Sequence, residues 1–314
     1  MLFAGRSATG LSALIAENLD VEIGTVDMRG LEDGSGSCRY LESVRGADVF
    51  IVQTAAPPLD EHLVELLVMI NAAKLASAKR VTAVLPRFFY AGHDRKSRPR
   101  EPITARLVAG MLESAGADRV LTMDLHAGQV QGFFSVPVDH MTALPLLADH
   151  FRLRCAATDT VVVSPDTGRT KLAGRFAALI GTPLAFLNRD SRIARARGMP
   201  IVVGAVAGKT AILIDDFINS GATLVSGAAS LMDAGATRVL AGATHGVFSG
   251  NAIERLAASA IEAIVITDTV PHTAVPGATR IEVLTVSGVL ATTIGNVFTD
   301  TSVSGIFAGA NELF

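Results

Sequence analysis

The chain has 314 residues, 49% of them hydrophobic, with 27 basic and 30 acidic residues and a net charge of −3. The length predicts about two domains, and the charge balance argues against a nucleic-acid partner, which would require a basic surface. No apolar run approaches the roughly 18 residues of a membrane span, and the first residues lack the order of a signal peptide. We expect a cytoplasmic protein without membrane association, in which Cys38 and Cys155 are reduced.

Short apolar segments alternate with helical segments along the chain. The expected strands are, in order, 49–53, 80–85, 119–123, 160–163, 183–187, 210–214, 238–244 and 263–267. The expected helices are 61–76, 104–114, 144–151, 171–180 and 223–234. This alternation is typical of βαβ units. It predicts an α/β fold with two tandem domains, 1–150 and 151–314, each a mostly parallel sheet flanked by helices.

Three loops rich in turn residues are candidate substrate loops: 32–37, 92–102 and 190–200. The segment 86–102 carries aromatic residues suited to stacking on a purine and cations suited to phosphates. A solvated charged loop explains its composition equally well. The loop 190–200 and its preceding residue hold several arginines, which suit a lid over a triphosphate, although a solvated charge run is the simpler reading of the spacing alone.

The strongest signal is the segment 210–223, in which a buried strand is expected to end in Asp215 and Asp216 before a helix opens. Backbone N–H groups at a helix start, together with Ser and Thr hydroxyls, form an anion site, and Gly221 allows a close backbone approach. The two carboxylates could accept sugar hydroxyls or hold a hydrated Mg²⁺. The alternative is an ordinary capped turn, for which burying two acids would be costly.

Two further strands are followed by polar residues. Asp166 follows the strand at 160–163, and Asp124 and His126 follow the strand at 119–123. Ligands of open α/β sheets bind beyond the carboxyl ends of the strands. A lone histidine is usually structural, but His126 beside a strand-end acid, with Asp166 in the same layer, favours a metal or nucleotide contact. The chain contains no Walker phosphate loop, no GxGxxG after a strand and no nucleophile elbow.

A set of short strings spans almost the whole sequence: Glu42-Ser-Val-Arg-Gly46, 61–67, Asp94-Arg-Lys96, 100–106, Met123-Asp-Leu-His126-Ala, 129–134, Val163-Ser-Pro-Asp166, 208–216, 244–250 and 302–307. In these strings, and in their order along the chain, the sequence resembles the ribose-phosphate pyrophosphokinase (phosphoribosyl-pyrophosphate synthetase) family.

This resemblance implies two phosphoribosyltransferase-like domains in a homo-oligomer, a hexamer or a dimer. It implies transfer of the diphosphoryl group of ATP, with Mg²⁺, to the C1 hydroxyl of ribose 5-phosphate, which gives phosphoribosyl pyrophosphate and AMP. By motif match, Asp215 and Asp216 would lie at the ribose, and His126 and Asp166 at the metal and nucleotide. The other implied residues are Asn219, Ser220, Gly221, Ala222 and Thr223 for the 5-phosphate, and Asp33, Gly34, Ser35, Gly92, His93 and Asp94 for the nucleotide.

Several positions depart from the family pattern in the nucleotide loops. Leu31 and Ser35 stand where the family has Phe and Glu, which removes a stacking face and an acceptor from the purine site. Gly92 and His93 replace Arg and Gln, which removes a guanidinium. These changes leave the identity of the nucleoside triphosphate open.

Other departures fall in the ribose and lid loops. Asn219 and Ala222 replace an acid and a glycine, and Arg169 replaces a glycine of the diphosphate loop. Arg189 stands at the family's catalytic Lys position and is the expected catalytic residue, and Ser191 stands at a catalytic Arg position and is expected to contact the substrate. A planar guanidinium differs from a compact ammonium, and losing one such charge can cost on the order of 10²–10³ in rate.

Three functions are therefore considered. The first is an active diphosphokinase with an altered nucleotide pocket. The second is a catalytically impaired paralogue that binds nucleotide or serves as a regulatory subunit. The third is a phosphoribosyltransferase that consumes the diphosphate product, against which the tandem halves and the early motifs argue.

Overall fold

The computed structural model describes residues 1–30, 36–272 and 280–306. The chain separates into two compact units. Unit 1 contains Met1–Thr142, Thr269–Pro271 and Thr285–Leu313, and unit 2 contains Ala143–Asp268 and His272–Leu284. The sequence-based division at 150/151 thus differs from the observed units in two respects. The units change at 142/143, and the last segment of the chain returns to unit 1.

Unit 1 is built on a five-stranded parallel sheet in the order β1-β4-β5-β6-β7. Its three inner strands are mostly apolar and are buried along nearly their whole length, as expected for a parallel sheet covered by helices. The five strands are β1 (Leu2–Ala4), β4 (Asp48–Val52), β5 (Arg80–Leu85), β6 (Arg119–Met123) and β7 (Val138–Met141).

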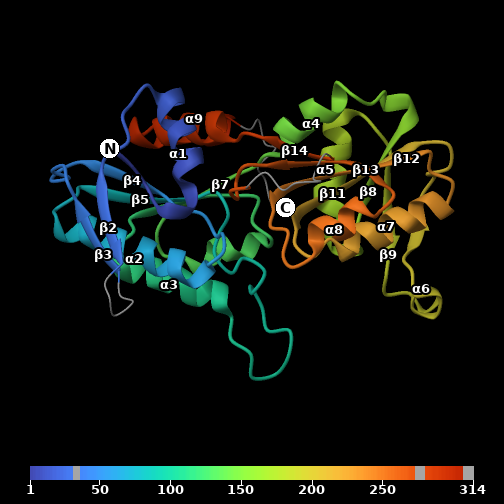
Figure 1. The fold of residues 1–314 in the computed structure, drawn as a ribbon, viewed down its shortest axis with the longest axis horizontal. Helices are drawn as coiled ribbons and strands as arrows, with labels where there is room; N and C mark the ends of the chain where they lie inside the picture. The colour runs from blue at the N-terminus through green and yellow to red at the C-terminus, as the bar shows by residue number, and fades with distance from the viewer. Residues whose placement is uncertain (31–35, 273–279, 307–314) are drawn as a thin grey trace. The chain divides into compact units, whose positions relative to one another are not determined.

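Helices cover both faces of this sheet (Figure 1). One face carries α1 (Thr9–Leu19) and α9 (Ser287–Phe298), and the other carries α2 (Leu59–Leu75) and α3 (Thr104–Ala115). A separate antiparallel hairpin of β2 (Val26–Gly30) and β3 (Gly36–Tyr40) packs on α2.

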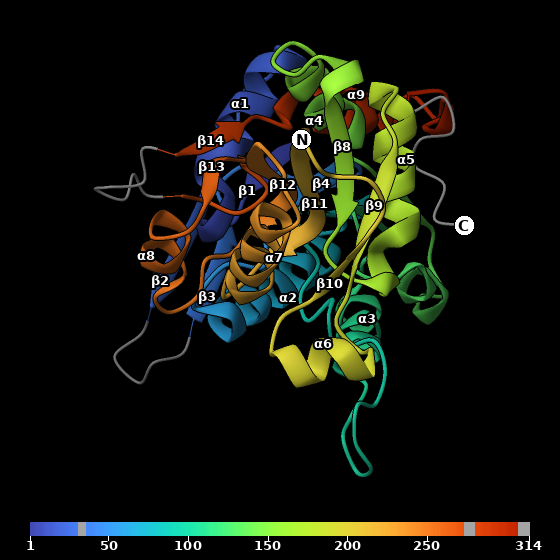
Figure 2. The same ribbon diagram turned by 90° about the vertical axis from the view of Figure 1, so that its right-hand side faces the viewer.

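Unit 2 has a seven-stranded sheet in the order β10-β9-β8-β11-β12-β13-β14. All neighbouring strands are parallel except β9 and β10, which form an antiparallel pair joined by α6 (Arg192–Arg197). Figure 2 shows α6 at the tip of this pair, away from the sheet. The strands are β8 (Thr160–Ser164), β9 (Leu184–Asn188), β10 (Ile201–Val203), β11 (Thr210–Ile218), β12 (Arg238–Gly246), β13 (Ile261–Thr267) and β14 (Ile281–Leu284).

The central strand of unit 2 divides its side chains between two cores. Ala211 and Leu213 pack in the core that contains α7 (Ala222–Asp233), whereas Ile212 and Ile214 pack against α4 (Leu144–Arg152) and α5 (Thr170–Ile180). This alternation follows from the two-residue period of a strand. The short helix α8 (Ala252–Ala257) packs on α7.

The α/β fold with parallel sheets flanked by helices is confirmed, but one detail at the acidic pair is wrong. Strand β11 does not end at Asp215 and Asp216; it continues to Ile218. The reason is that β12 is also longer than predicted and pairs with this extension, Phe217 opposite His245 and Ile218 opposite Gly246. Within the described residues, no helix is long and apolar enough to span a membrane.

Candidate functional site

The acidic pair of β11, Asp215 and Asp216, lies beyond the point where this strand is paired on both sides. Pairing of β11 with β8 ends at Leu213, so from Asp215 onward the strand is paired with β12. The Asp216 side chain is 3% exposed and that of Asp215 is 15% exposed, and the Asp216 backbone N–H donates to Asp215 Oδ1 over 2.9 Å. Burial and the charge of Asp216 raise the pKa of Asp215 well above its ordinary value. Ionising both of these largely shielded acids is therefore costly unless a cation lies nearby.

Arg169 supplies that cation from the loop after β8. Its Nε lies 3.1 Å from Asp216 Oδ1 and 3.6 Å from Asp215 Oδ1. The guanidinium therefore opposes the rise in the pKa of Asp215. Sequence reasoning recorded Arg169 only as a departure from a glycine and missed this contact, because no spacing rule links residues 169 and 215.

Asp166 caps the turn that carries Arg169. Its Oδ1 accepts hydrogen bonds from the backbone N–H groups of Gly168, over 2.8 Å, and of Arg169, over 3.0 Å. A strand-end acid that caps the next turn satisfies N–H groups left unpaired by the backbone. Both of these backbone hydrogen bonds go to one oxygen of the carboxylate, Oδ1.

Arg189 follows β9 and reaches the start of α7. Its Nη2 donates to the carbonyl of Thr223 over 2.6 Å and to Ser226 Oγ over 3.0 Å, and its Nε donates to the carbonyl of Pro165 over 3.3 Å. Burial lowers the pKa of Arg189, while the charges of Asp166 and Asp215 act to raise it. The predicted catalytic residue is thus tied to the helix that follows the acidic pair, through Ser226, a residue that sequence reasoning did not identify.

Ser191 begins the short helix α6. Its Oγ accepts from the backbone N–H of Ala194 over 3.0 Å, and its own N–H donates to Asn188 Oδ1 over 3.1 Å. Serine is a preferred capping residue for this purpose. At the position where the resemblance implied a catalytic arginine, this chain therefore has a helix cap.

The segment 219–223 links β11 to α7. Gly221 has φ +71 and forms the N-cap of α7, and a Cβ at this position would lie 2.9 Å from Leu256 Cγ. The Asn219 carbonyl accepts from the Ser249 N–H over 3.1 Å, and the Ser220 carbonyl from Arg255 Nη1 over 2.6 Å.

The neighbouring loop residues lie at or near the surface, and the Ser220 hydroxyl accepts from the Ala222 backbone N–H over 3.5 Å. Asn219, Ser220 and Ala222 are exposed, and Thr223 is half-buried. Because the first N–H groups of a helix have no carbonyl partner within it, the start of the twelve-residue helix α7 has the chemistry of an anion site.

The remaining predicted residues that the structure describes belong to unit 1. Asp94 is buried, and Gln129 Nε2 donates to its Oδ2 over 2.5 Å. Gly92 and His93 are exposed, and the His93 ring meets the Tyr90 ring edge to face with centroids 5.6 Å apart. His126 is half-buried and follows β6. Asp33, Gly34 and Ser35 lie outside the described residues.

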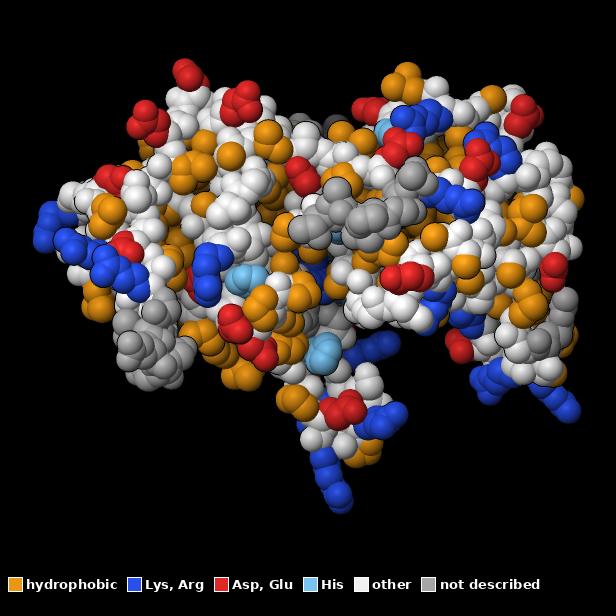
Figure 3. All heavy atoms as spheres, viewed as in Figure 1, with side chains coloured by type: hydrophobic (Ala, Val, Ile, Leu, Met, Phe, Trp, Pro, Cys, Tyr) orange, Lys and Arg blue, Asp and Glu red, His pale blue; other side chains and the backbone are white. Residues whose placement is uncertain are grey.

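The segment between β5 and α3 extends from unit 1 as a loop (Figure 1). Its residues 95–100 are all exposed, and Figure 3 shows Lys and Arg side chains gathered on this extension. Such an exposed basic loop has the composition expected of a phosphate contact as well as that of a solvated loop.

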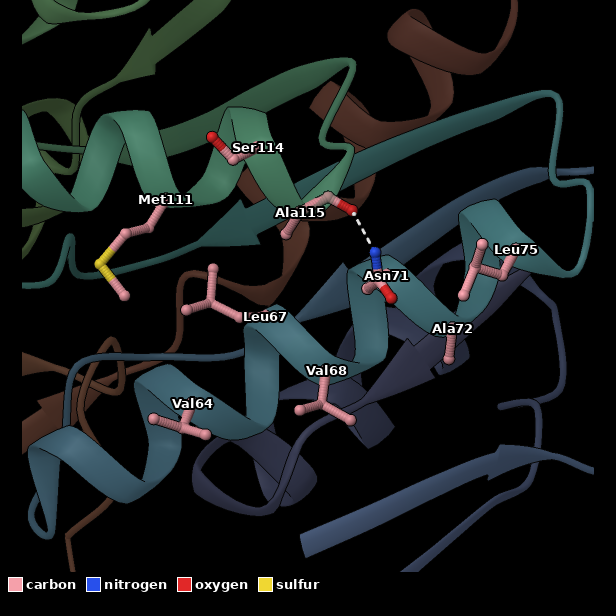
Figure 4. A pocket seen from close by; sticks show the side chains of 9 residues that line it. All are labelled: Val64, Leu67, Val68, Asn71, Ala72, Leu75, Met111, Ser114 and Ala115. Atoms are coloured by element: carbon pink, nitrogen blue, oxygen red, sulfur yellow. Dashed lines mark hydrogen bonds between the residues drawn. The ribbon is translucent and has the colours of Figure 1, made fainter.

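Unit 1 also has a groove of about 560 Å³ between α2 and α3 (Figure 4). Apolar side chains dominate it, and none of its nine lining residues is charged: Val64, Leu67, Val68, Asn71, Ala72, Leu75, Met111, Ser114 and Ala115. A triphosphate or a sugar phosphate needs cationic or N–H donors, so this groove does not fit either substrate.

A metal site was predicted at His126 and Asp166, which belong to units 1 and 2 respectively. Among the described residues, no group of three or more His, Cys, Asp or Glu side chains could hold a metal ion. Mg²⁺ prefers oxygen ligands, and proteins commonly hold it through one or two carboxylates together with substrate phosphates rather than in a complete protein cage. Of the two residues, the Asp166 carboxylate has the chemistry that this ion prefers.

Comparisons with known proteins cover nearly the full chain. The family model of the N-terminal domain of ribose phosphate pyrophosphokinase matches residues 1–116, and that of the phosphoribosyl synthetase-associated domain matches residues 159–308. The ribose-phosphate pyrophosphokinase of Corynebacterium efficiens is 44% identical, covering 98% of this chain and 96% of that protein. That of Mycobacterium tuberculosis is 45% identical with the same coverage.

A solved structure gives the same result. The crystal structure of phosphoribosylpyrophosphate synthetase from Mycobacterium smegmatis superposes with a TM-score of 0.90 at 44% identity, covering 96% of this chain and 99% of that chain. Identity at this level over nearly the full length of each relative extends well beyond the fold. The chain belongs to the ribose-phosphate pyrophosphokinase family.

Proposed function

We propose that the protein is a ribose-phosphate diphosphokinase that transfers the diphosphoryl group of ATP to ribose 5-phosphate. The observation that carries the proposal is the arrangement in the last part of β11, where two largely shielded carboxylates lie a few residues before a helix that starts at a glycine. Carboxylates accept hydrogen bonds from sugar hydroxyls, and the backbone N–H groups at the start of a helix bind phosphate. A ribose 5-phosphate offers both groups on one small molecule.

In this proposal Asp215 and Asp216 accept hydrogen bonds from ribose hydroxyls, and the first turn of α7 binds the 5-phosphate. Ser220 and Thr223 add hydroxyl donors, Gly221 permits the close approach of the backbone, and Asn219 and Ala222 complete the loop. Holding the sugar by both ends fixes the direction of its C1 hydroxyl. Such orientation of a nucleophile is a large part of phosphoryl-transfer catalysis.

The reaction balances without an additional reactant. The C1 hydroxyl oxygen attacks the β-phosphorus of ATP, the bond from that phosphorus to the oxygen bridging the α- and β-phosphates breaks, and AMP leaves with that oxygen. The hydroxyl proton is released. Arg189, held at the start of α7 by Thr223 and Ser226, supplies positive charge beside the transferred group.

Mg²⁺ is part of the proposal, with Asp166 and His126 as its protein partners. When bound, the ion supplies charge neutralisation at the phosphoryl oxygens. Asp166 would offer Oδ2, since both of its backbone hydrogen bonds go to Oδ1.

The nucleotide is assigned to unit 1 in the same proposal. Gly92, His93 and Asp94 are its expected contacts there, along with the undescribed Asp33, Gly34 and Ser35. Gln129 fixes the Asp94 carboxylate, while the exposed His93 ring, which already meets Tyr90, is accessible to a ligand. We also propose a homo-oligomer, a dimer or a hexamer, and a cytoplasmic location, where the free Cys38 and Cys155 would remain reduced.

A turnover assay tests this function. The full chain is incubated with ribose 5-phosphate, Mg²⁺ and ATP, GTP, CTP or UTP in separate reactions, and the nucleotide products are separated chromatographically. Release of the nucleoside monophosphate together with phosphoribosyl pyrophosphate is the expected result. Release of ADP would indicate transfer of a single phosphoryl group, and no release with any donor would indicate the impaired paralogue.

Two further arms sharpen this assay. Asp216→Asn should abolish most turnover, whereas Asp233→Asn, at the exposed end of α7, should leave turnover unchanged. Consumption of phosphoribosyl pyrophosphate with a nucleobase, without synthesis from ATP, would instead identify a phosphoribosyltransferase.

A further inference from the structure

Arg169 stands in an unusual place for a surface-loop arginine. It lies in the turn after β8, at the end of the short helical segment Thr167–Arg169, yet its side chain is only 20% exposed and points to the acidic pair of β11. One nitrogen, Nε, lies within 4 Å of a carboxylate oxygen of both acids. A single side chain thus bridges two residues of a neighbouring strand.

The sheet register explains how the arginine reaches this position. Strand β8 stops pairing with β11 at Val163 and Leu213, after which the β8 chain turns away through Pro165. The next residues of β11 therefore lose their neighbour on that side, and Arg169 reaches across to the carboxylates there. Asp166 stabilises this turn, because its carboxylate accepts a hydrogen bond from the Arg169 backbone N–H.

The energetic consequence is local to the two acids. Two carboxylates this close, both largely shielded from water, repel each other, and each pays a desolvation cost when ionised. A bridging guanidinium offsets part of both terms and fixes the side-chain directions, because its N–H groups are set in a rigid plane. Without it, the pKa of Asp215 would rise further, and one acid would more readily take up a proton or turn toward solvent.

We propose that Arg169 is a positioning residue for the sugar: its guanidinium holds Asp215 and Asp216 in the arrangement that accepts the ribose hydroxyls. This inference rests on the proposed function, since it assigns the acidic pair to ribose. Arg169 acts through the two acids and does not contact the reacting phosphorus. Its effect therefore falls on ribose 5-phosphate binding more than on the chemical step.

The test compares Arg169→Ala and Arg169→Lys with the wild type. Lys171→Ala is the matched control, because it removes a nearby cation whose side chain is exposed. Ribose 5-phosphate is titrated into each protein by calorimetry, and KM and kcat are measured for each substrate. We expect Arg169→Ala to weaken ribose 5-phosphate binding by about tenfold to a hundredfold, as the loss of one charge-assisted contact predicts, while kcat changes by less than about threefold.

Arg169→Lys should recover part of the binding, since an ammonium restores the charge but not the bridging plane. Unchanged binding in Arg169→Ala would overturn the proposal. Tighter binding in that variant would overturn it as well, because it would mean that the guanidinium blocks the site. Thermal unfolding of each variant shows whether it is folded, and if Arg169→Ala fails to fold, Arg169→Lys and Arg169→Gln carry the comparison.

The calorimetric arm separates this inference from the proposed function. If the wild type binds ribose 5-phosphate but releases no AMP, the function fails while the role of Arg169 is still measured. If the wild type turns over normally and Arg169→Ala binds the sugar equally well, the role of Arg169 alone is refuted.

Discussion

Replacing Gly221 by alanine should damage both the stability of unit 2 and the binding of ribose 5-phosphate. Gly221 has φ +71 at the N-cap of α7, a backbone conformation that side chains disfavour. An added Cβ would also lie 2.9 Å from Leu256 Cγ and 3.2 and 3.3 Å from its two Cδ atoms. Leu256 is 2% exposed, so it has little room to move.

The two contributions can be estimated separately. The left-handed conformation costs a non-glycine residue about 1–2 kcal/mol, and overpacking a close-packed site costs about 1–3 kcal/mol. Gly221→Ala should thus lower the free energy of unfolding by about 2–5 kcal/mol. Gly181 is a matched control, because it also has φ +71 but has no atom within 4 Å of its added Cβ. Gly181→Ala should cost only about 1–2 kcal/mol.

Urea unfolding followed by circular dichroism measures both variants, and calorimetric titration with ribose 5-phosphate measures binding. Gly221→Ala should also bind the sugar more weakly, because relieving the contact with Leu256 displaces the first turn of α7. Adding Leu256→Ala should recover about 1–3 kcal/mol of coupling energy in a double-mutant cycle. Equal costs for Gly221→Ala and Gly181→Ala would refute the packing argument, and normal sugar binding by Gly221→Ala would refute the placement of the phosphate.

Two other substitutions test charge and domain organisation. The raised pKa of Asp215 means that the folded state holds a proton on this carboxyl more tightly than the unfolded state does. The Asp215 carboxyl therefore does not destabilise the fold at pH values below its ordinary pKa of 3.8, and it lowers the free energy of unfolding as pH rises above that value. Asp215→Asn should therefore raise Tm at pH 8, lose that gain near pH 3.8 and weaken sugar binding; a gain independent of pH would contradict this cause. Leu290→Ala in α9, a buried position, should cost about 2–5 kcal/mol and reduce amide protection in unit 1, whereas Phe298→Ala, 57% exposed, should cost little. Loss of protection in unit 2 instead would place α9 there, as the division at 150/151 predicts.

Much of the parallel-sheet framework follows from sequence pattern alone. The strands Arg80–Leu85 and Arg119–Met123 have the bounds that the sequence predicts, because buried parallel strands are short apolar runs between polar turns. The hairpin of β2 and β3 was not predicted, since its strands are only partly buried and lack an apolar run. The first and last helices, α1 and α9, were not predicted either; the small and apolar residues of α9 are dispersed over 287–298 without a strong polar face.

The packing of α9 in unit 1 depends on long-range contacts, which a local sequence pattern cannot predict. Arg80, at the start of β5, donates to the carbonyl of Val297 over 3.1 Å and pairs with Asp300 over 2.8 Å. Asn18 of α1 donates to Ser287 Oγ over 3.2 Å. These contacts join segments more than 200 residues apart, and nothing in the residues of either segment specifies the other.

The features of the candidate site also fall into two groups: those that neighbouring residues in the sequence specify, and those that depend on contacts between distant residues. The helix start at Gly221 and the acids before it could be recognised because they are adjacent in sequence and each type has a local physical role. The contacts of Arg169 and Arg189 could not, because they join each arginine to residues that are distant in the sequence. Both arginines are substitutions relative to the family pattern, yet both guanidinium groups make defined contacts, with the acidic pair and with the first residues of α7. Departures from a family pattern that rebuild contacts in this way argue for an altered but organised site, because loss of function by drift would leave buried charges without partners.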